Sequence, residues 1–277
     1  MSVAPRPALR LVILDMDGVL YRGDAPIPGA VRLVQRLHAA GLLVRYATNN
    51  SMFTRAAYAS RLAGMGIEAS AEEIVTSTSA TIEHLRRHDP AVRSVLAVGA
   101  SGMVDELRAA GYAVTPIGEA GEPPAPVDAV LVGLDPAFDE PRLAAAAEAV
   151  RGGARFVATN ADARYPTSTG FQPGAGTMVT AIRERCGVEA LVIGKPEPAM
   201  FEAILEAAGV SAAEALVIGD NPDSDIAGAR RAGIESILVL TGVTSPDVAA
   251  GLTGEARPDH VAADPAAAWV LIGERVG

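Results

Sequence analysis

The chain of 277 residues is 49% hydrophobic and carries a formal net charge of −10. This length suits one large domain or two modest ones, and an acidic chain without a basic run is not expected to bind nucleic acid. No apolar segment approaches the roughly 18 residues that indicate a membrane-spanning helix, so we expect no membrane association. A single cysteine, Cys186, and an N-terminus without the pattern of a signal peptide favour a reducing, cytoplasmic setting.

The first part of the chain alternates between predicted strands and helices. Apolar runs predict strands at 11–14, 42–47 and 73–76, and helical spacing predicts helices at 30–40, from Thr54 to about Gly66, and at 79–88. This alternation is typical of a parallel sheet with right-handed crossovers.

The middle of the chain reads as a second α/β unit. Its predicted strands are 94–99, 128–134 and 154–159, and its predicted helices are 101–110, 140–150 and 177–185. The pattern then returns to that of the first part, with strands at 191–193, 215–218, 236–240 and 260–261 and helices at 199–208, 226–232 and from Pro265. We therefore predict a discontinuous core (1–89 and 190–277) and an inserted domain (90–189).

Polar side chains follow four of the strands predicted for the core. They are Asp15 and Asp17; Thr48, Asn49 and Asn50; Lys195; and Asp220, with Asp223 and Asp225 nearby. In a parallel sheet all such ends meet at one edge, which is where open α/β sheets bind ligands. Strand alternation directs Asp15 and Asp17 toward the same side, and a divalent cation is the usual way to keep two such carboxylates useful at neutral pH.

This set of side chains suits phosphoryl transfer. One carboxylate can attack phosphorus, a second can protonate the leaving oxygen, and a hydroxyl, amides and an ammonium group can bind the phosphoryl oxygens. A further carboxylate can complete an oxygen-rich Mg²⁺ site. Each residue alone could be a helix cap, a turn residue or a solvated lysine, and it is their joint occurrence at strand ends that favours the chemistry.

Four segments, DMDGVLYRG, ATNNS, GKPEP and GDNPDSDI, resemble the four motifs of the haloacid dehalogenase-like (HAD) superfamily phosphatases. The segments TNNSMFTR, VGLDPAFD, ATNAD, PGAGTMV and VLTGV are similar to the subfamily with a large C2-type α/β cap, the NagD-like and 4-nitrophenylphosphatase-like enzymes. The resemblance implies a Rossmann-like parallel-sheet core with an inserted α/β cap. It also implies Mg²⁺-dependent hydrolysis of a phosphomonoester through an aspartyl-phosphate.

The resemblance further implies a role for each matching residue. Asp15 would be the nucleophile and Asp17 the general acid and base, while Thr48, Asn49, Asn50 and Lys195 would bind the phosphoryl group. Mg²⁺ would be held by Asp15, the backbone carbonyl of Asp17 and Asp220, and Asp225 would hold Lys195 or a metal-bound water. The cap loop 160–165 faces the active site in the resembled family, so we hypothesise that Arg164 or Tyr165 contacts the leaving group.

The sequence leaves the substrate and the acceptor open. Sugar phosphates, glycerol 3-phosphate, phosphoglycolate, pyridoxal phosphate and nucleoside monophosphates all fit a small-metabolite phosphatase. A phosphotransferase using the same intermediate is one alternative, and a non-catalytic sensor of phosphorylated ligands is another, although a sensor would not need an acid two residues after a nucleophile. The resemblance also suggests a homo-oligomer, a dimer or larger.

Overall fold

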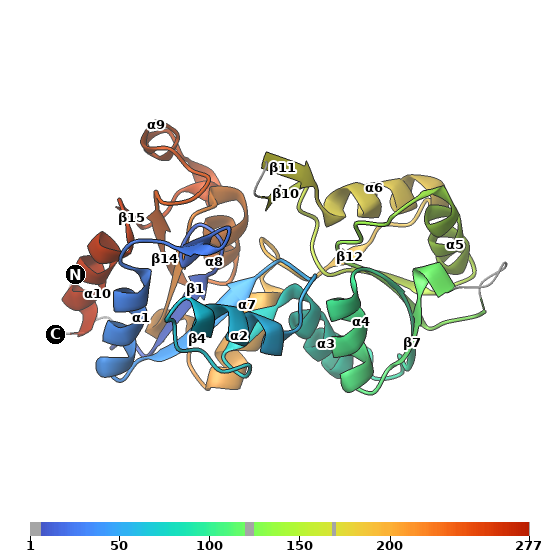
Figure 1. Ribbon diagram of the computed structural model, residues 1–277, viewed down its shortest axis with the longest axis horizontal. Helices are drawn as coiled ribbons and strands as arrows, with labels where there is room; N and C mark the ends of the chain where they lie inside the picture. Colours follow the sequence, from blue (N-terminus) through green and yellow to red (C-terminus); the bar gives the residue numbers. More distant parts are fainter. Residues whose placement is uncertain (1–6, 120–124, 168–169, 277) are drawn as a thin grey trace, which may run out of the picture. The chain divides into compact units, whose positions relative to one another are not determined.

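The computed structural model describes residues 7–119, 125–167 and 170–276, and contacts within the chain divide it into two compact units (Figure 1). The first unit comprises the chain up to Thr48, Ala56–Val75 and the chain from Lys195 onward. The second comprises Asn49–Arg55 and Thr76–Gly194. Each unit is built on its own sheet, as expected from the alternating pattern of strands and helices.

The first unit contains a six-stranded sheet in the order β15-β14-β13-β1-β4-β5. Its strands are β1 (Leu11–Asp15), β4 (Leu43–Thr48), β5 (Ile74–Thr76), β13 (Ala215–Gly219), β14 (Glu235–Val239) and β15 (His260–Ala262). β1 pairs in parallel with β13 on one side and β4 on the other, and all five of its residues are buried. Burial on both faces explains why this strand is a continuous apolar run rather than an alternating one.

Helices and a small hairpin complete the first unit. The helices are α1 (Ala30–Ala39), α2 (Arg55–Gly64), α7 (Ala199–Ala208), α8 (Ala227–Arg231), α9 (Pro246–Ala250) and α10 (Pro265–Val276), and the hairpin pairs β2 (Tyr21–Arg22) with β3 (Ala25–Pro26). α1 packs against α10 and buries Leu33, Val34 and Leu37, which share one face at helical spacing. Gly41 (φ +73°) ends this helix in the left-handed region that a side chain disfavours.

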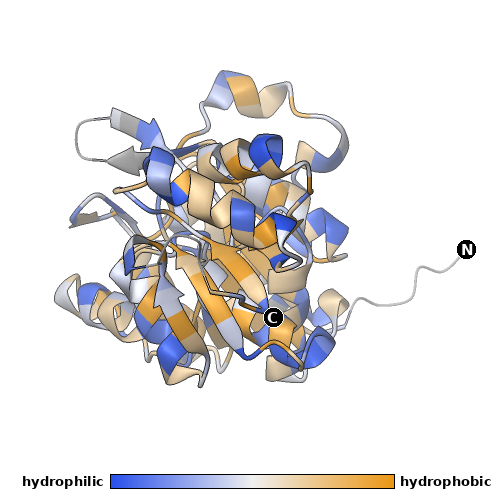
Figure 2. Ribbon diagram, turned by 90° about the vertical axis from the view of Figure 1, so that its right-hand side faces the viewer, coloured by the Kyte–Doolittle hydropathy of each residue, from blue (hydrophilic) through white to orange (hydrophobic). Residues whose placement is uncertain are grey.

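The second unit is built on a parallel sheet in the order β12-β9-β8-β6-β7. Its strands are β6 (Ser94–Val98), β7 (Ala113–Pro116), β8 (Ala129–Val132), β9 (Arg155–Ala158) and β12 (Leu191–Val192), with an antiparallel hairpin of β10 (Arg164–Thr167) and β11 (Gly170–Pro173). Its helices are α3 (Ser77–His88), α4 (Ser101–Ala109), α5 (Glu140–Arg151) and α6 (Ala175–Cys186). Figure 2 shows strands coloured as hydrophobic at the centre and helices that carry polar residues around them.

The elements that were not anticipated from the sequence include β7, the β2–β3 and β10–β11 hairpins, and α9. β7 is an edge strand whose residues are exposed or half-buried, so it lacks the apolar run that revealed its neighbours. The start of α3 also differs from the predicted Ser79. The hydroxyl of Thr76 accepts a hydrogen bond from the Ser79 backbone N–H and the Ser79 hydroxyl accepts one from the Thr76 N–H, both at 3.0 Å, so the helix begins at Ser77.

The expected boundaries of the inserted domain, at residues 90 and 189, are displaced outward in the structure. α3 falls in the second unit, where it contacts α4, and β12 pairs with β9 in the second sheet. The prediction that Lys195 follows a strand of the core sheet is therefore wrong. A two-residue strand that is half exposed carries no signal of which sheet it joins, because pairing is decided by tertiary structure.

Within the described residues, no helix is long and apolar enough to cross a membrane.

Candidate active site

The carboxyl ends of three neighbouring strands in the first unit carry the predicted residues. Asp15 is the last residue of β1, Thr48 is the last residue of β4, and Asp220 directly follows β13. β1 lies between the other two, and Asp15 stands opposite Ala47 in the register with β4. All three side chains are buried. Removing the two aspartate carboxylates from water is costly unless a nearby positive charge compensates them.

Lys195 supplies part of that compensation. Its Nζ donates to Oδ1 of Asp15 and to Oδ1 of Asp225, both at 2.6 Å, and to the carbonyl of Ala47 at 3.3 Å. The lysine is only 3% exposed. Burial alone would lower the pKa of Lys195, but the two carboxylates outweigh burial and raise it above the ordinary value, so the ammonium stays charged.

Asp225 is held by the short π-helical turn Pro222–Ile226. Its Oδ2 accepts a hydrogen bond from the backbone N–H of Asn221 at 3.1 Å, while Oδ1 accepts the one from Lys195. Asp225 is thus fixed on one oxygen by the backbone and binds the ammonium group of Lys195 with the other. Asp223, whose role the sequence left open, is exposed, and its backbone N–H bonds to the Asn221 side chain at 3.0 Å, which is the geometry of a turn.

Asp220 is fixed by a loop that follows β14. Its Oδ2 accepts from the Val243 N–H at 2.7 Å, and the Thr244 hydroxyl donates to its backbone carbonyl at 2.7 Å. Two glycines make room for the carboxylate: a Cβ would lie 2.3 Å from Oδ2 if added at Gly18 and 1.7 Å if added at Gly242. The chemistry of the residues alone gave no reason to select this loop, and only the resemblance of VLTGV drew attention to it.

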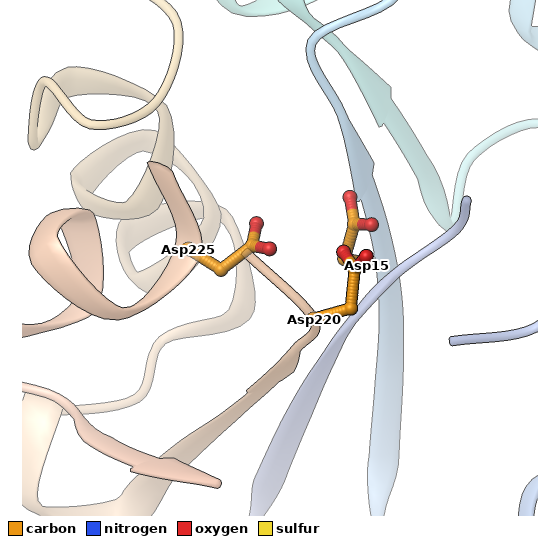
Figure 3. Close-up of side chains that lie close together, drawn as sticks. All are labelled: Asp15, Asp220 and Asp225. Carbon is orange, nitrogen blue, oxygen red and sulfur yellow. The ribbon is translucent and has the colours of Figure 1, made fainter. Parts of the chain in front are cut away.

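One carboxylate oxygen from each of Asp15, Asp220 and Asp225 lies within 4.8 Å of the other two, and Figure 3 shows the three carboxylates coming from β1, the end of β13 and the short helix. Burial, followed by the charge of Asp225, raises the pKa of Asp220 to about 7. Burial also raises the pKa of Asp15 well above its ordinary value, despite the opposing effect of Lys195. A buried cluster of hard oxygen donors with excess negative charge, in a space kept open by glycines, fits Mg²⁺.

Asp17 lies outside this cluster of three. It is half-buried, its backbone forms a bridge with Tyr21, and its Oδ2 is 3.4 Å from the Tyr21 hydroxyl. Burial raises the pKa of Asp17, and Arg61 and Tyr21 offset part of the rise. A carboxyl that holds its proton more readily than usual is suited to act as an acid near neutral pH.

The remaining predicted residues belong to the second unit. Asn49 donates through Nδ2 to both carboxylate oxygens of Asp162 at 3.1 Å, and Oδ1 of Asn50 accepts from the Met52 N–H at 2.9 Å. Arg164 and Tyr165 lie on β10, where the Tyr165 hydroxyl bonds to Gln172 at 2.8 Å. The bond between Asn49 and Asp162 had no signal in the sequence, because Asp162 follows a different strand.

The fold and this site define an α/β enzyme of the haloacid dehalogenase class. Models of the haloacid dehalogenase-like hydrolases match residues 12–113, and models of the HAD-hydrolase-like proteins match residues 192–268. The chain belongs to this family.

Several proteins similar to this chain are phosphatases. The chain is 35% identical over 235 residues to an acid sugar phosphatase of Staphylococcus saprophyticus, covering 85% of this chain and 88% of that protein. The structure of a 4-nitrophenylphosphatase from Thermotoga maritima has a TM-score of 0.86 at 30% identity, covering 94% and 96% of the two chains. A glycerol phosphate phosphatase from Mycobacterium tuberculosis, solved in complex with magnesium, has a TM-score of 0.83 at 33% identity, covering 94% and 76%. The predicted relationship to HAD phosphatases is thus confirmed, and the protein is a phosphatase of this family.

Proposed function

We propose that the protein is a Mg²⁺-dependent phosphatase that hydrolyses a small phosphomonoester through an aspartyl-phosphate on Asp15. The observation that carries the proposal is the buried ion-pair network in which Lys195 bridges Asp15 and Asp225, beside the carboxylate of Asp220. Structural ion pairs do not require a third carboxylate at the same point, whereas a site for a metal and a phosphoryl group does.

In the first step, a carboxylate oxygen of Asp15 forms a bond to phosphorus. The bond from phosphorus to the leaving oxygen breaks, its electron pair goes to that oxygen, and Asp17 gives the oxygen a proton. Lys195 offsets negative charge on the phosphoryl group, and Thr48 and Asn49 donate hydrogen bonds to it.

In the second step, water forms a bond to phosphorus and gives a proton to Asp17. The bond between phosphorus and the Asp15 oxygen breaks, its electron pair returns to the Asp15 carboxylate, and phosphate is released. Mg²⁺, held by Asp15, Asp220 and the carbonyl of Asp17, would supply positive charge where negative charge develops. Hydrolysis rather than transfer depends on water as the acceptor. Comparison of phosphate release with phosphorylation of added alcohols separates the two reactions.

The similarity to acid sugar, glycerol phosphate and nitrophenyl phosphatases supports a small phosphorylated metabolite as the substrate. Sugar phosphates and glycerol 3-phosphate are the first candidates, followed by phosphoglycolate, pyridoxal phosphate and nucleoside monophosphates. We assign the choice among them to the second unit, with Arg164 and Tyr165 as contacts of the leaving group. Exchange of each for Ala should change relative kcat/KM across a substrate panel more than the affinity for inorganic phosphate.

The direct test is phosphate release from 4-nitrophenyl phosphate and from a panel of phosphorylated metabolites, with Mg²⁺ and with EDTA. We expect the wild type to be active and to lose its activity in EDTA. The Asp15→Asn variant should be inactive, whereas an Asp223→Asn variant should retain activity because Asp223 is exposed. A wild type as inert as Asp15→Asn on every compound would overturn the enzyme assignment and favour the ligand sensor.

A further inference from the structure

Tyr21 stands beside Asp17 in a tight turn that follows β1. The turn is fixed by backbone hydrogen bonds from Gly18 N–H to the Tyr21 carbonyl (2.9 Å) and from Leu20 N–H to the Met16 carbonyl (2.9 Å). The Tyr21 side chain is fully buried. A buried phenol needs a partner for its hydroxyl, and the hydroxyl of Tyr21 points to Asp17.

The contact distinguishes the two oxygens of the Asp17 carboxyl. The Tyr21 hydroxyl lies 3.4 Å from Oδ2, and a phenol remains protonated at neutral pH, so Tyr21 is the donor and Oδ2 the acceptor. A carboxylic acid carries its proton on one oxygen and only accepts through the other. With Oδ2 engaged as an acceptor, the proton belongs on Oδ1.

Arg61 lies over the face of the tyrosine ring. The guanidinium lies 4.5 Å from the centroid of the Tyr21 ring, a cation–π arrangement. Its Nη2 donates to the carbonyl of Gly23 at 2.6 Å and lies 3.3 Å from Oδ1 of Asp24. Arg61 is thereby tied to the turn that joins β2 and β3, and the ring has little freedom to rotate away from Asp17.

We propose that Tyr21 is a positioning residue for acid catalysis: it holds Oδ2 of Asp17 so that Oδ1 presents the proton to the leaving oxygen. The inference rests on the proposed function, in which Asp17 is the acid. Tyr21 itself does not touch the substrate. Its contribution should therefore scale with how much the leaving group needs a proton.

The experiment compares kcat/KM for two substrates in the intact, Mg²⁺-loaded enzyme. The leaving group of glycerol 3-phosphate is a strongly basic alkoxide, which needs a proton. The leaving group of 4-nitrophenyl phosphate is a weakly basic phenolate, which needs almost no protonation. kcat/KM reports only the steps up to departure of the leaving group, so the later action of Asp17 on water does not enter. Tyr21→Phe removes the hydroxyl and keeps the ring under Arg61.

We expect Tyr21→Phe to lower kcat/KM about tenfold for glycerol 3-phosphate and less than twofold for 4-nitrophenyl phosphate, since a positioned acid contributes roughly 10²–10⁴-fold in all. Tyr46→Phe is the matched control. Tyr46 is also fully buried in the first unit, but its hydroxyl donates to the Glu68 carbonyl at 3.0 Å, so its loss should not discriminate between the substrates.

A double-mutant cycle separates positioning from a general structural effect. Asp17→Asn should lose far more activity on glycerol 3-phosphate than on 4-nitrophenyl phosphate, and adding Tyr21→Phe to it should cause no further selective loss. Arg61→Met, which leaves the tyrosine in place, should show the selective loss in weaker form.

Equal losses on both substrates in Tyr21→Phe, or an undiminished selective effect in the double mutant, would overturn the role of Tyr21 and leave the proposed function standing. A wild type inactive on both substrates, or an Asp15→Asn variant that retains activity, would instead overturn the proposed function and this inference with it.

Discussion

The side-chain amide of Asn49 donates to both carboxylate oxygens of Asp162, each at 3.1 Å. The backbone around Asn49 is also fixed, because its carbonyl accepts from Ser77 Oγ at 2.7 Å and from Asn160 Nδ2 at 2.8 Å. Asn49 is the first residue of the second unit, directly after Thr48 at the end of β4. A residue predicted to bind phosphate is therefore oriented by the loop that was expected to face the substrate.

Removal of Asp162 should take away the two hydrogen-bond contacts that orient the side-chain amide of Asn49. We expect Asp162→Ala to weaken competitive inhibition by inorganic phosphate about five- to tenfold, equivalent to about 1 kcal/mol, the usual size of one net hydrogen bond. Inhibition constants measured with 4-nitrophenyl phosphate check this. Asp105→Ala, an exposed carboxylate on α4 of the same unit, serves as the control. An unchanged inhibition constant in Asp162→Ala would show that the contact between Asp162 and Asn49 does not contribute to phosphate binding.

Lys195 should matter for stability as well as for catalysis. Lys195→Met leaves Asp15 and Asp225 buried without their cation, and loss of one partner of a buried ion pair typically costs about 3–5 kcal/mol. Urea unfolding with EDTA present measures this cost. Arg231→Met, which removes exposed bridges to Glu197 and Glu255, should cost less than about 1 kcal/mol. Similar losses in the two variants would contradict the buried network.

The metal-free protein should become more stable as the pH falls through about 7. Since the pKa of Asp220 is about 7 in the folded protein and about 4 in an unfolded chain, the folded form binds a proton in this interval that the unfolded form does not. The free energy of unfolding therefore rises on acidification through this window. Asp220→Asn, which mimics the protonated acid, should be more stable than wild type above pH 7, and the difference should shrink toward pH 4.

Mg²⁺ should reverse this dependence, because the ion competes with the proton for the same carboxylates. Thermal unfolding with and without Mg²⁺ should show a stabilisation that grows from pH 5 to pH 8 and is absent in Asp220→Asn. If the stabilisation by Mg²⁺ did not depend on pH, the ion would bind at a site other than the carboxylate of Asp220.

The small space around Asp220 gives a steric prediction. Gly242→Ala would bring a Cβ to 1.7 Å from Oδ2 of Asp220, so the carboxylate must move and Mg²⁺ affinity should fall at least tenfold. Gly64→Ala is the matched control, because no atom lies within 4 Å of a Cβ there. Titration of Mg²⁺ by calorimetry compares the two variants, and equal affinities would show that the loop after β14 does not shape the metal site.

Asp17→Asn should separate the two chemical steps. The 4-nitrophenolate leaves without an acid, but water still needs a base, so the phosphoryl-enzyme should accumulate. Mass spectrometry of rapidly quenched protein should find one added phosphoryl group, on Asp15. If Asp17→Asn carried no covalent phosphate during steady-state turnover, water would instead attack the phosphorus of the substrate directly.

Much of this protein could be read from its sequence. The buried run Leu11–Leu14, ending in Asp15 and Asp17, predicted the central strand, because a short, β-branched apolar segment favours a strand covered on both faces. The strand-end positions of Thr48 and Asp220 followed from the same local logic, and so did the helix ends at glycines such as Gly41. These features depend on short-range periodicity and turn chemistry.

Other features were decided only by tertiary structure. β12 joins the second sheet although its sequence resembled a strand of the core, so Lys195 reaches Asp15 from outside the core sheet. The partners of Asn49 and Tyr21, and the glycine-lined space for Asp220, depend on which distant segments meet. Strand pairing and side-chain contact are non-local, and no spacing along the chain encodes them. The sequence by itself determined which chemical groups this phosphatase has, and the tertiary structure decided which of them touch.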